Sequence, residues 1–214
     1  MNLILLGMPG SGKGTQAKMI SGKYGIPHIS TGEIFRGLKG PLADEVGGYV
    51  NKGQLVPDEI VFKVVADRLG KDDCAAGYLL DGFPRNLNQA EIFEKDNESG
   101  GKQLPSVIYM ELSRDVVVKR LSARRNCPEC RADYNVVSMP PAKEGICDKC
   151  GAKLVSRRDD NEDVIRNRLQ VYNDETSPLV EFYTRKKRIY RINADNTVEG
   201  IFENICSVLD KTGK

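Results

Sequence analysis

Short apolar runs alternate along the chain with longer amphipathic segments. A continuous apolar run bounded by turn residues is typical of a buried strand. Residues 2–6 show this pattern, and four further segments are predicted strands: 26–29, 77–81, 105–112 and 188–193. The segments between them carry apolar residues at helical spacing. Strands that alternate with helices predict an α/β fold with a mostly parallel five-stranded sheet and right-handed crossovers.

Local signals place the helices between these strands. Ser30-Thr31-Gly32-Glu33 resembles a helix N-cap. Pro57-Asp58-Glu59 opens a helix, because proline is tolerated in the first turn and acids suit the N-terminal dipole. Further helices are predicted at 87–97, 115–125, 162–188 and 198–209, with Pro178 as a kink or break. Residues 126–160 differ, since they are rich in cysteine, proline and glycine and carry few apolar runs, and we interpret them as an inserted module.

Composition excludes several classes of protein. The 214 residues suit one domain, or one domain with sizeable insertions. No segment approaches the roughly 20 apolar residues of a membrane span, and the amino terminus lacks the basic region of a signal peptide. A net charge of only +2 argues against a generic nucleic-acid binder. We therefore expect a cytoplasmic protein whose cysteines are thiols or metal ligands.

A glycine-rich segment follows the first predicted strand. Gly7-Met8-Pro9-Gly10-Ser11-Gly12-Lys13 matches the phosphate-binding pattern G-x-x-x-x-G-K between a strand and a helix. Glycines let the backbone turn tightly and direct N–H groups at phosphate oxygens, and the lysine supplies a mobile cation. The alternative is a glycine-rich turn without a ligand. The flanking strand and helix favour the phosphate loop.

The position after the lysine departs from the general pattern. Most P-loop proteins carry a hydroxyl there that binds Mg²⁺, whereas this chain has Gly14 and then Thr15. Either Thr15 serves differently, or other groups hold the metal. Asp81 ends a predicted strand and is the candidate for holding Mg²⁺ through water, although a strand-end aspartate can also be only a helix cap.

Four of the six cysteines form two Cys-x2-Cys pairs separated by 16 residues: Cys127, Cys130, Cys147 and Cys150. This spacing predicts a tetrahedral four-thiolate zinc site, which is structural because no position is left open. The alternatives are two disulfides, a redox pair, or iron in the same thiolates. Cys74 and Cys206 stand apart, and we expect them to be buried small apolar residues.

Several motifs, taken together, resemble the adenylate kinase family. In that family, as in this chain, Gly and then Thr follow the lysine of the P-loop. Ser-Thr-Gly-Glu-Ile-Phe-Arg at 30–36 is similar to the family's monophosphate-binding segment. Gly-Tyr-Leu-Leu-Asp-Gly-Phe-Pro-Arg at 77–85, with Gln89, is similar to the family signature. Residues 157–162, with Arg168, are similar to the segment that closes the lid. The motifs follow the family's order over nearly the whole chain.

The resemblance implies a P-loop NTPase-type three-layer sandwich with two mobile insertions. The core would comprise 1–29, 60–122 and 161–214, the monophosphate-binding domain 30–59, and the zinc-containing lid 123–160. The implied reaction is ATP + AMP ⇌ 2 ADP with Mg²⁺, which balances adenine nucleotides. The implied partners are ATP, AMP and ADP, without nucleic acid or membrane, and a monomer is expected.

The resemblance also assigns site residues. The implied ATP contacts are Gly10, Ser11, Gly12, Lys13, Gly14, Thr15, Arg120, Arg124, Asp133, Tyr134 and Asn196. The implied AMP contacts are Thr31, Arg36, Gln54, Leu55, Val56, Gly82, Phe83, Pro84, Arg85, Gln89, Arg157 and Arg168. The implied catalytic residues are Lys13, Arg85, Arg124, Arg157 and Arg168. A glutamine such as Gln89 can contact adenine through both ends of its amide, which is a physical basis for selecting AMP.

Phosphoryl transfer explains why such a site is rich in arginine. Charge develops on phosphate oxygens, so catalysis depends on positioning and on cations. The planar guanidinium binds phosphate through two hydrogen bonds and stays charged. The acceptor is itself an ionised phosphate, so no general base is needed, and the only histidine, His28, is assigned no catalytic role.

Two other functions remain open at this point. A zinc-ribbon module on a nonenzymatic nucleotide switch would use its basic residues to bind nucleic acid, but a switch needs no second phosphate clamp. A kinase for UMP, CMP or GMP would share most of the same motifs. The long lid and Thr31 favour AMP.

Overall fold

The computed structural model describes residues 1–211, apart from the side chain of Arg158. Its centre is a five-stranded sheet in the order β2-β3-β1-β4-β7. All four strand pairings are parallel, so the carboxyl ends of the strands meet at one edge. The strands are β1 (Asn2–Gly7), β2 (His28–Ser30), β3 (Tyr78–Asp81), β4 (Ser106–Glu111) and β7 (Ile189–Asn193). The predicted α/β architecture is confirmed.

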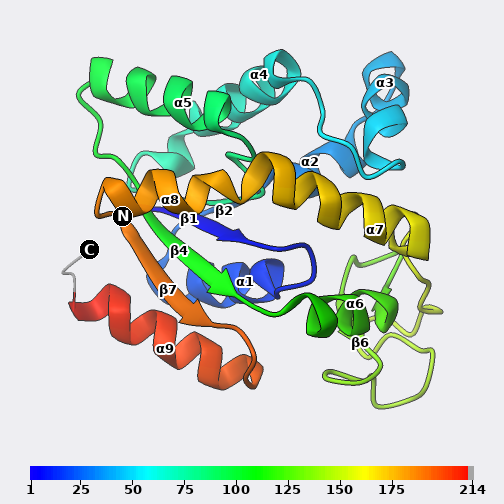
Figure 1. Ribbon diagram of the computed structural model, residues 1–214. Helices are drawn as coiled ribbons and strands as arrows, with labels where there is room; N and C mark the ends of the chain where they lie inside the picture. The colour runs from blue at the N-terminus through cyan, green and yellow to red at the C-terminus, as the bar shows by residue number, and fades with distance from the viewer. Residues whose placement is uncertain (212–214) are drawn as a thin grey trace.

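Helices cover both faces of this sheet and make three layers, while α3 lies to one side of it (Figure 1). The helices are α1 (Lys13–Tyr24), α2 (Thr31–Gly37), α3 (Pro41–Val50), α4 (Asp58–Leu69), α5 (Leu87–Ser99), α6 (Arg114–Ser122), α7 (Glu162–Val171), α8 (Pro178–Arg185) and α9 (Val198–Lys211). Short 3₁₀ turns occupy Asp72–Cys74 and Arg158–Asp160, and a π-helical segment spans Tyr172–Thr176. None of the helices in residues 1–211 combines the length and apolar character needed to cross a bilayer.

The strands explain how one sheet supports two cores. Successive side chains of a strand point to opposite faces. Leu3 and Leu5 of β1 accordingly pack with residues of α1, α6 and α9, whereas Ile4 and Leu6 pack with residues of α4, α5 and α8. All four are at most 2% exposed. The continuous apolar run seen in the sequence is therefore the signature of burial on both faces.

Two predicted helices differ from the structure. The helix expected at 115–125 ends at Ser122, and Arg124 lies instead in the short strand β5 (Arg124–Asn126). The helix expected at 162–188 is divided into α7, the π-helical segment and α8. Pro178 is the first residue of α8, where its missing N–H and fixed φ are tolerated. It therefore marks a break in the helix.

The segment between α6 and α7 has its own small structure. Strand β5 pairs in antiparallel fashion with β6 (Asp133–Asn135), and Asn126 bridges to Val155. Its buried cluster consists only of Ala132, Tyr134, Leu154 and two cysteines. The expected burial of Cys74 and Cys206 is confirmed, since they are 8% and 6% exposed.

Candidate functional site

The phosphate-loop pattern lies where the sequence predicts, between β1 and α1. Gly10 and Gly12 have φ of +82° and +94°, a conformation that favours glycine. A Cβ at Gly10 would lie 2.8 Å from Cγ of Leu121 in α6, so the loop also packs too closely for a side chain. Gly12 is the N-cap of α1, which directs the N-terminal end of that helix at the loop.

Lys13 is the first residue of α1, and its ammonium folds back onto the loop. Its Nζ donates to the carbonyl oxygens of Gly7 and Met8 at 2.7 and 2.8 Å. Burial lowers the pKa of Lys13 to about 8, and the nearby Asp81 carboxylate opposes that shift only in part. A polyanion bound at the loop would add negative charge next to the Lys13 ammonium and would favour its charged form.

Asp81 ends β3 beside the phosphate loop and is 8% exposed. Nε2 of His28 lies 3.3 Å from its Oδ2. Burial alone would raise the pKa of Asp81, but the hydrogen bond from His28 and the charge of Lys13 outweigh burial, so the pKa is lowered and the carboxylate stays ionised. Sequence reasoning missed this contact of His28, because only the sheet register places β2 next to β3.

Two adjoining cavities lie at the carboxyl edge of the sheet. The larger, of about 280 Å³, is lined among others by Gly10, Gly12, Lys13, Gly14, Thr15, Arg36, Leu55, Asp81, Gly82, Pro84, Arg85, Arg120, Arg124, Asp133, Tyr134, Arg157 and Arg168. The smaller, of about 60 Å³, is lined among others by Thr31, Arg36, Gln54, Leu55, Val56, Gly82, Arg85, Gln89 and Arg168. The structure thus brings together most residues that the motifs single out.

Three predicted site residues line neither cavity. Phe83 is 1% exposed and makes edge-on ring contacts with Phe62 and Phe93 in the core. Ser11, within the phosphate loop, is 0% exposed. Asn196 lies in the turn before α9, where its Oδ1 accepts a hydrogen bond from the N–H of Thr197. The nucleotide contacts assigned to these residues stay predictions.

Three arginines that the resemblance assigns to catalysis, Arg124, Arg157 and Arg168, come from separate elements, and each pairs with a carboxylate in this structure. Nη2 of Arg124 lies 2.5 Å from Asp160, and Nη2 of Arg157 lies 2.5 Å from Asp133. Nη1 of Arg168 lies 3.0 and 3.2 Å from carboxylate oxygens of Asp159 and Asp160. The arginines therefore already converge, and the acids separate like charges that would otherwise repel one another.

Burial and nearby charges shift the pKa values of Arg168 and Asp159. Burial lowers the pKa of Arg168 to about 10, although the charge of Asp159 opposes this shift. Burial would raise the pKa of Asp159, but the charges of Arg168 and Arg124 outweigh burial and lower it. All these groups are ionised at neutral pH. Sequence reasoning missed the role of these acids, although the adjacent Asp159-Asp160 pair was visible beside Arg157.

The smaller cavity is bordered by amide and hydroxyl groups in fixed positions. Gln89 is 1% exposed; its Oε1 accepts from the N–H of Arg85 at 2.7 Å, and its Nε2 donates to Asp58 at 2.6 Å. Thr31 donates from its hydroxyl to the carbonyl oxygen of Gly82 at 2.8 Å. An amide has two N–H groups and two lone pairs on oxygen. Gln89 therefore keeps one donor and one acceptor for a base.

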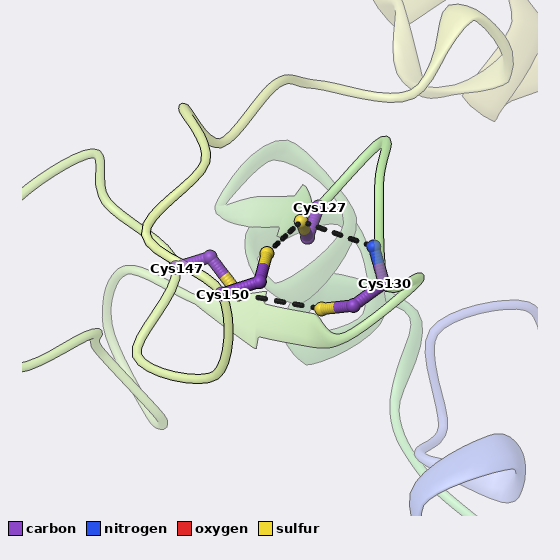
Figure 2. Close-up of side chains that lie close together, drawn as sticks. All are labelled: Cys127, Cys130, Cys147 and Cys150. Carbon is purple, nitrogen blue, oxygen red and sulfur yellow. Dashed lines mark hydrogen bonds between the residues drawn. The ribbon is translucent and has the colours of Figure 1, made fainter.

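The four cysteines of the two pairs gather in one cluster (Figure 2). Their sulfur atoms all lie within 4.8 Å of one another. The Sγ–Sγ distances are 3.3 Å from Cys127 to Cys150 and 3.5 Å from Cys130 to Cys147. Zn–S bonds of about 2.3 Å in a tetrahedron place the sulfurs roughly 3.8 Å apart. The cluster fits a four-thiolate metal site, and all six cysteines are free thiols without a disulfide.

The backbone explains how the two pairs come to face each other. In each pair the first cysteine donates its N–H to the carbonyl five residues later, Ala132 or Ala152. The carbonyl of that first cysteine accepts from the N–H of Arg131 or Gly151, both with positive φ. The two turns thus have the same hydrogen-bond pattern and present their sulfurs to a common centre.

Comparison with known proteins adds to this geometry. The adenylate kinase family model matches residues 5–188. The chain is 46% identical to an adenylate kinase of Clostridium tetani over 212 residues, or 98% of each chain. It is 47% identical to one of Thermoanaerobacter sp. over 220 aligned positions, covering both chains completely. An adenylate kinase of Geobacillus sp. is 47% identical over 98% of each chain.

The chain belongs to the adenylate kinase family. The resemblance noted in the sequence is thereby confirmed, and so is the predicted P-loop α/β fold. The reaction of adenylate kinases, ATP + AMP ⇌ 2 ADP, needs two phosphate-bearing ligands side by side. The roles of individual residues within the cavities stay predictions.

Proposed function

We propose that this adenylate kinase is a phosphotransferase that catalyses the reversible reaction ATP + AMP ⇌ 2 ADP. The observation that carries the proposal is the larger cavity, where the phosphate loop with Lys13 faces guanidinium groups from the signature, β5 and α7. Phosphoryl transfer is catalysed mainly by alignment and by cations near the equatorial oxygens. A cavity with a helix N-terminus on one side and arginines on the other has those properties.

The chain's own residues divide the work between donor and acceptor. Gly10, Gly12 and Lys13 bind the donor phosphates, while Arg85 and Arg168, which line both cavities, hold the acceptor phosphate. Adenylate kinases use Mg²⁺ with ATP; the ion neutralises phosphate charge, and the ionised Asp81 is the group that would hold it through water. The acceptor oxygen is already ionised, so no residue has to remove a proton.

Closure would complete this arrangement. We assign residues 30–59 to a monophosphate-binding domain and 123–160 to a lid, both moving against the P-loop core. The pairs Arg124–Asp160 and Arg157–Asp133 support this assignment, because carboxylates hold the guanidinium groups in place until phosphate replaces them. A closed lid excludes water, which is the competing acceptor.

We assign zinc to the four-cysteine cluster as a structural metal, with one ion per chain. Four thiolates satisfy zinc fully, so it takes no part in transfer. We further propose that the protein acts in the cytoplasm as a monomer on free ATP, AMP and ADP, without nucleic acid or membrane. The net charge of +2 supports this, since polyanion binders carry a large basic excess.

The test measures ADP formation from Mg-ATP with AMP, UMP, CMP or GMP as acceptor. AMP should be the best acceptor, and Lys13→Ala should lower kcat by about 100- to 1,000-fold, because a cation aimed at the developing charge is lost. Lys63→Ala, at an exposed position in α4, is the matched control and should keep full activity. Faster transfer to UMP or CMP than to AMP would overturn the acceptor assignment, and high activity of Lys13→Ala would overturn the role of the loop.

A further inference from the structure

Three side-chain amides converge on one carboxylate just outside the smaller cavity. Asp58, the first residue of α4, accepts from Nδ2 of Asn88 and from Nε2 of Gln89, each at 2.6 Å. Nδ2 of Asn86 donates to the same carboxylate at 3.1 Å. Asn86 is also the N-cap of α5, because its Oδ1 accepts from the N–H of Gln89 at 2.8 Å. The start of α4 is thus joined to the start of α5 around Gln89.

These contacts fix which way round the Gln89 amide lies. A backbone N–H only donates, so the atom facing Arg85 has to be the amide oxygen. An ionised carboxylate only accepts, so the atom facing Asp58 has to be the amide nitrogen. A flipped amide would face a donor with a donor and an acceptor with an acceptor. Gln89 is 1% exposed, so water cannot compensate for such mismatches.

A fixed amide distinguishes purines that have the same shape. Adenine presents an amino donor at position 6, which pairs with the amide oxygen of a glutamine. Hypoxanthine and guanine present a carbonyl acceptor there, so the same oxygen would meet another acceptor. Only a flipped amide would suit them, and Asp58 opposes the flip.

We propose that Asp58 is a positioning residue that sets base specificity at the acceptor site by holding Gln89 in the orientation that accepts an adenine amino group. Asp58 does not line either cavity, so it acts through Gln89 and touches no substrate. The proposal rests on the function proposed above, in which the smaller cavity takes the acceptor base.

The test compares AMP with IMP, whose base differs from adenine only at positions 1 and 6. Asp58→Asn keeps the shape but can offer Gln89 either a donor or an acceptor. It therefore removes one of the two contacts that oppose a flip and leaves only the N–H of Arg85 to hold the amide oxygen. The ratio of kcat/KM for AMP to kcat/KM for IMP should fall about tenfold, because the variant should use IMP better, relative to AMP, than the parent enzyme does. A purely structural defect would lower both values together and leave the ratio unchanged. Asp58→Ser provides a second variant with the same expected change.

Further variants show whether Asp58 acts through Gln89. Asn88→Ala removes another donor to the same carboxylate and should leave the ratio unchanged. Gln89→Ala should lower the ratio by itself, and adding Asp58→Asn to it should have no further effect. An unchanged ratio in both Asp58 variants overturns the proposal while Gln89→Ala still supports the base site. If Gln89→Ala also leaves the ratio unchanged, the assignment of the base site falls as well.

Discussion

The central sheet and the four-cysteine segment are stabilised in different ways within one chain. Strands β1 and β4 bury side chains such as Ile4 and Ile108 completely. Between residues 123 and 160, by contrast, the buried cluster has only three residues besides cysteine, and Val137 is 80% exposed. Apolar burial is the main driving force for compact domains. The segment has little of it, and its four cysteine sulfurs gather in one cluster that fits a metal.

This difference matches what each region contributes to the proposed reaction. The sheet carries Asp81 at the end of β3, and α1, which follows β1, carries Lys13 at the same edge. The four-cysteine segment contributes Arg124 and Arg157, which are held by ion pairs. In the proposed function this segment moves as a unit around its metal, since its four cysteines lie together in one cluster. Metal removal, a cavity in the sheet and loss of an ion pair between the regions should have progressively smaller effects.

Removing the metal should have the largest effect and should be confined to one region. Structural zinc contributes about 10–16 kcal/mol to the folding of small modules. Chelation, or Cys130→Ser, should therefore greatly accelerate amide hydrogen exchange in residues 123–160, while the sheet stays protected. Glu129→Gln is the matched control, since it changes an exposed neighbour in the same turn. Equal exchange with and without metal would contradict the stabilisation of residues 123–160 by the metal. Simultaneous loss of protection in the sheet would contradict the independence of the two regions.

A cavity in the sheet should have the next largest effect and the opposite distribution. Ile108 is 0% exposed in β4, so Ile108→Ala should lower the free energy of unfolding by about 2–5 kcal/mol. Denaturant unfolding followed by circular dichroism measures this change. Val137→Ala is the control and should be nearly neutral, because its side chain is already in solvent. Metal affinity that falls in parallel with core stability would show that the two regions are not independent.

The smallest effect is expected where the two regions meet. Nζ of Lys18 in α1 lies 3.2 Å from Asp133 in β6 and 3.9 Å from Glu33 in α2. Exposed ion pairs contribute about 0.5 kcal/mol, so Lys18→Gln should raise KM for ATP about twofold. The difference should disappear at high salt, where such pairs are screened. Lys63→Gln serves as control, and a difference that persists in 1 M salt would argue against an ionic contact.

The sequence predicted elements whose cause is local. The apolar run of β1, the glycine loop and the proline before α4 each carry their own signal, and each lies where it was expected. The two cysteine pairs were equally clear, because metal spacing is read along the chain. The boundary of α6 was not predicted, since the basic residues after Ser122 suit a helix as well as they suit β5.

What the sequence could not show depends on contacts between distant segments. Asp160 holds Arg124 across 36 positions and Asp58 holds Gln89 across 31. His28 reaches Asp81 only because β2 lies next to β3 in the sheet. Aspartates are common on surfaces, so no pattern distinguishes the acids that hold a functional group from those that are only solvated. The candidate site residues could be predicted from the sequence, but the partners that hold them in place could not.

The bridge between Asn126 and Val155 has a consequence for how such a chain can be altered. Each residue donates its N–H to the carbonyl of the other, at 2.8 and 3.0 Å. The polypeptide therefore leaves the rest of the molecule and returns to it at the same place. Because the two ends of the stretch are neighbours, a change in its length need not alter how the flanking elements are connected.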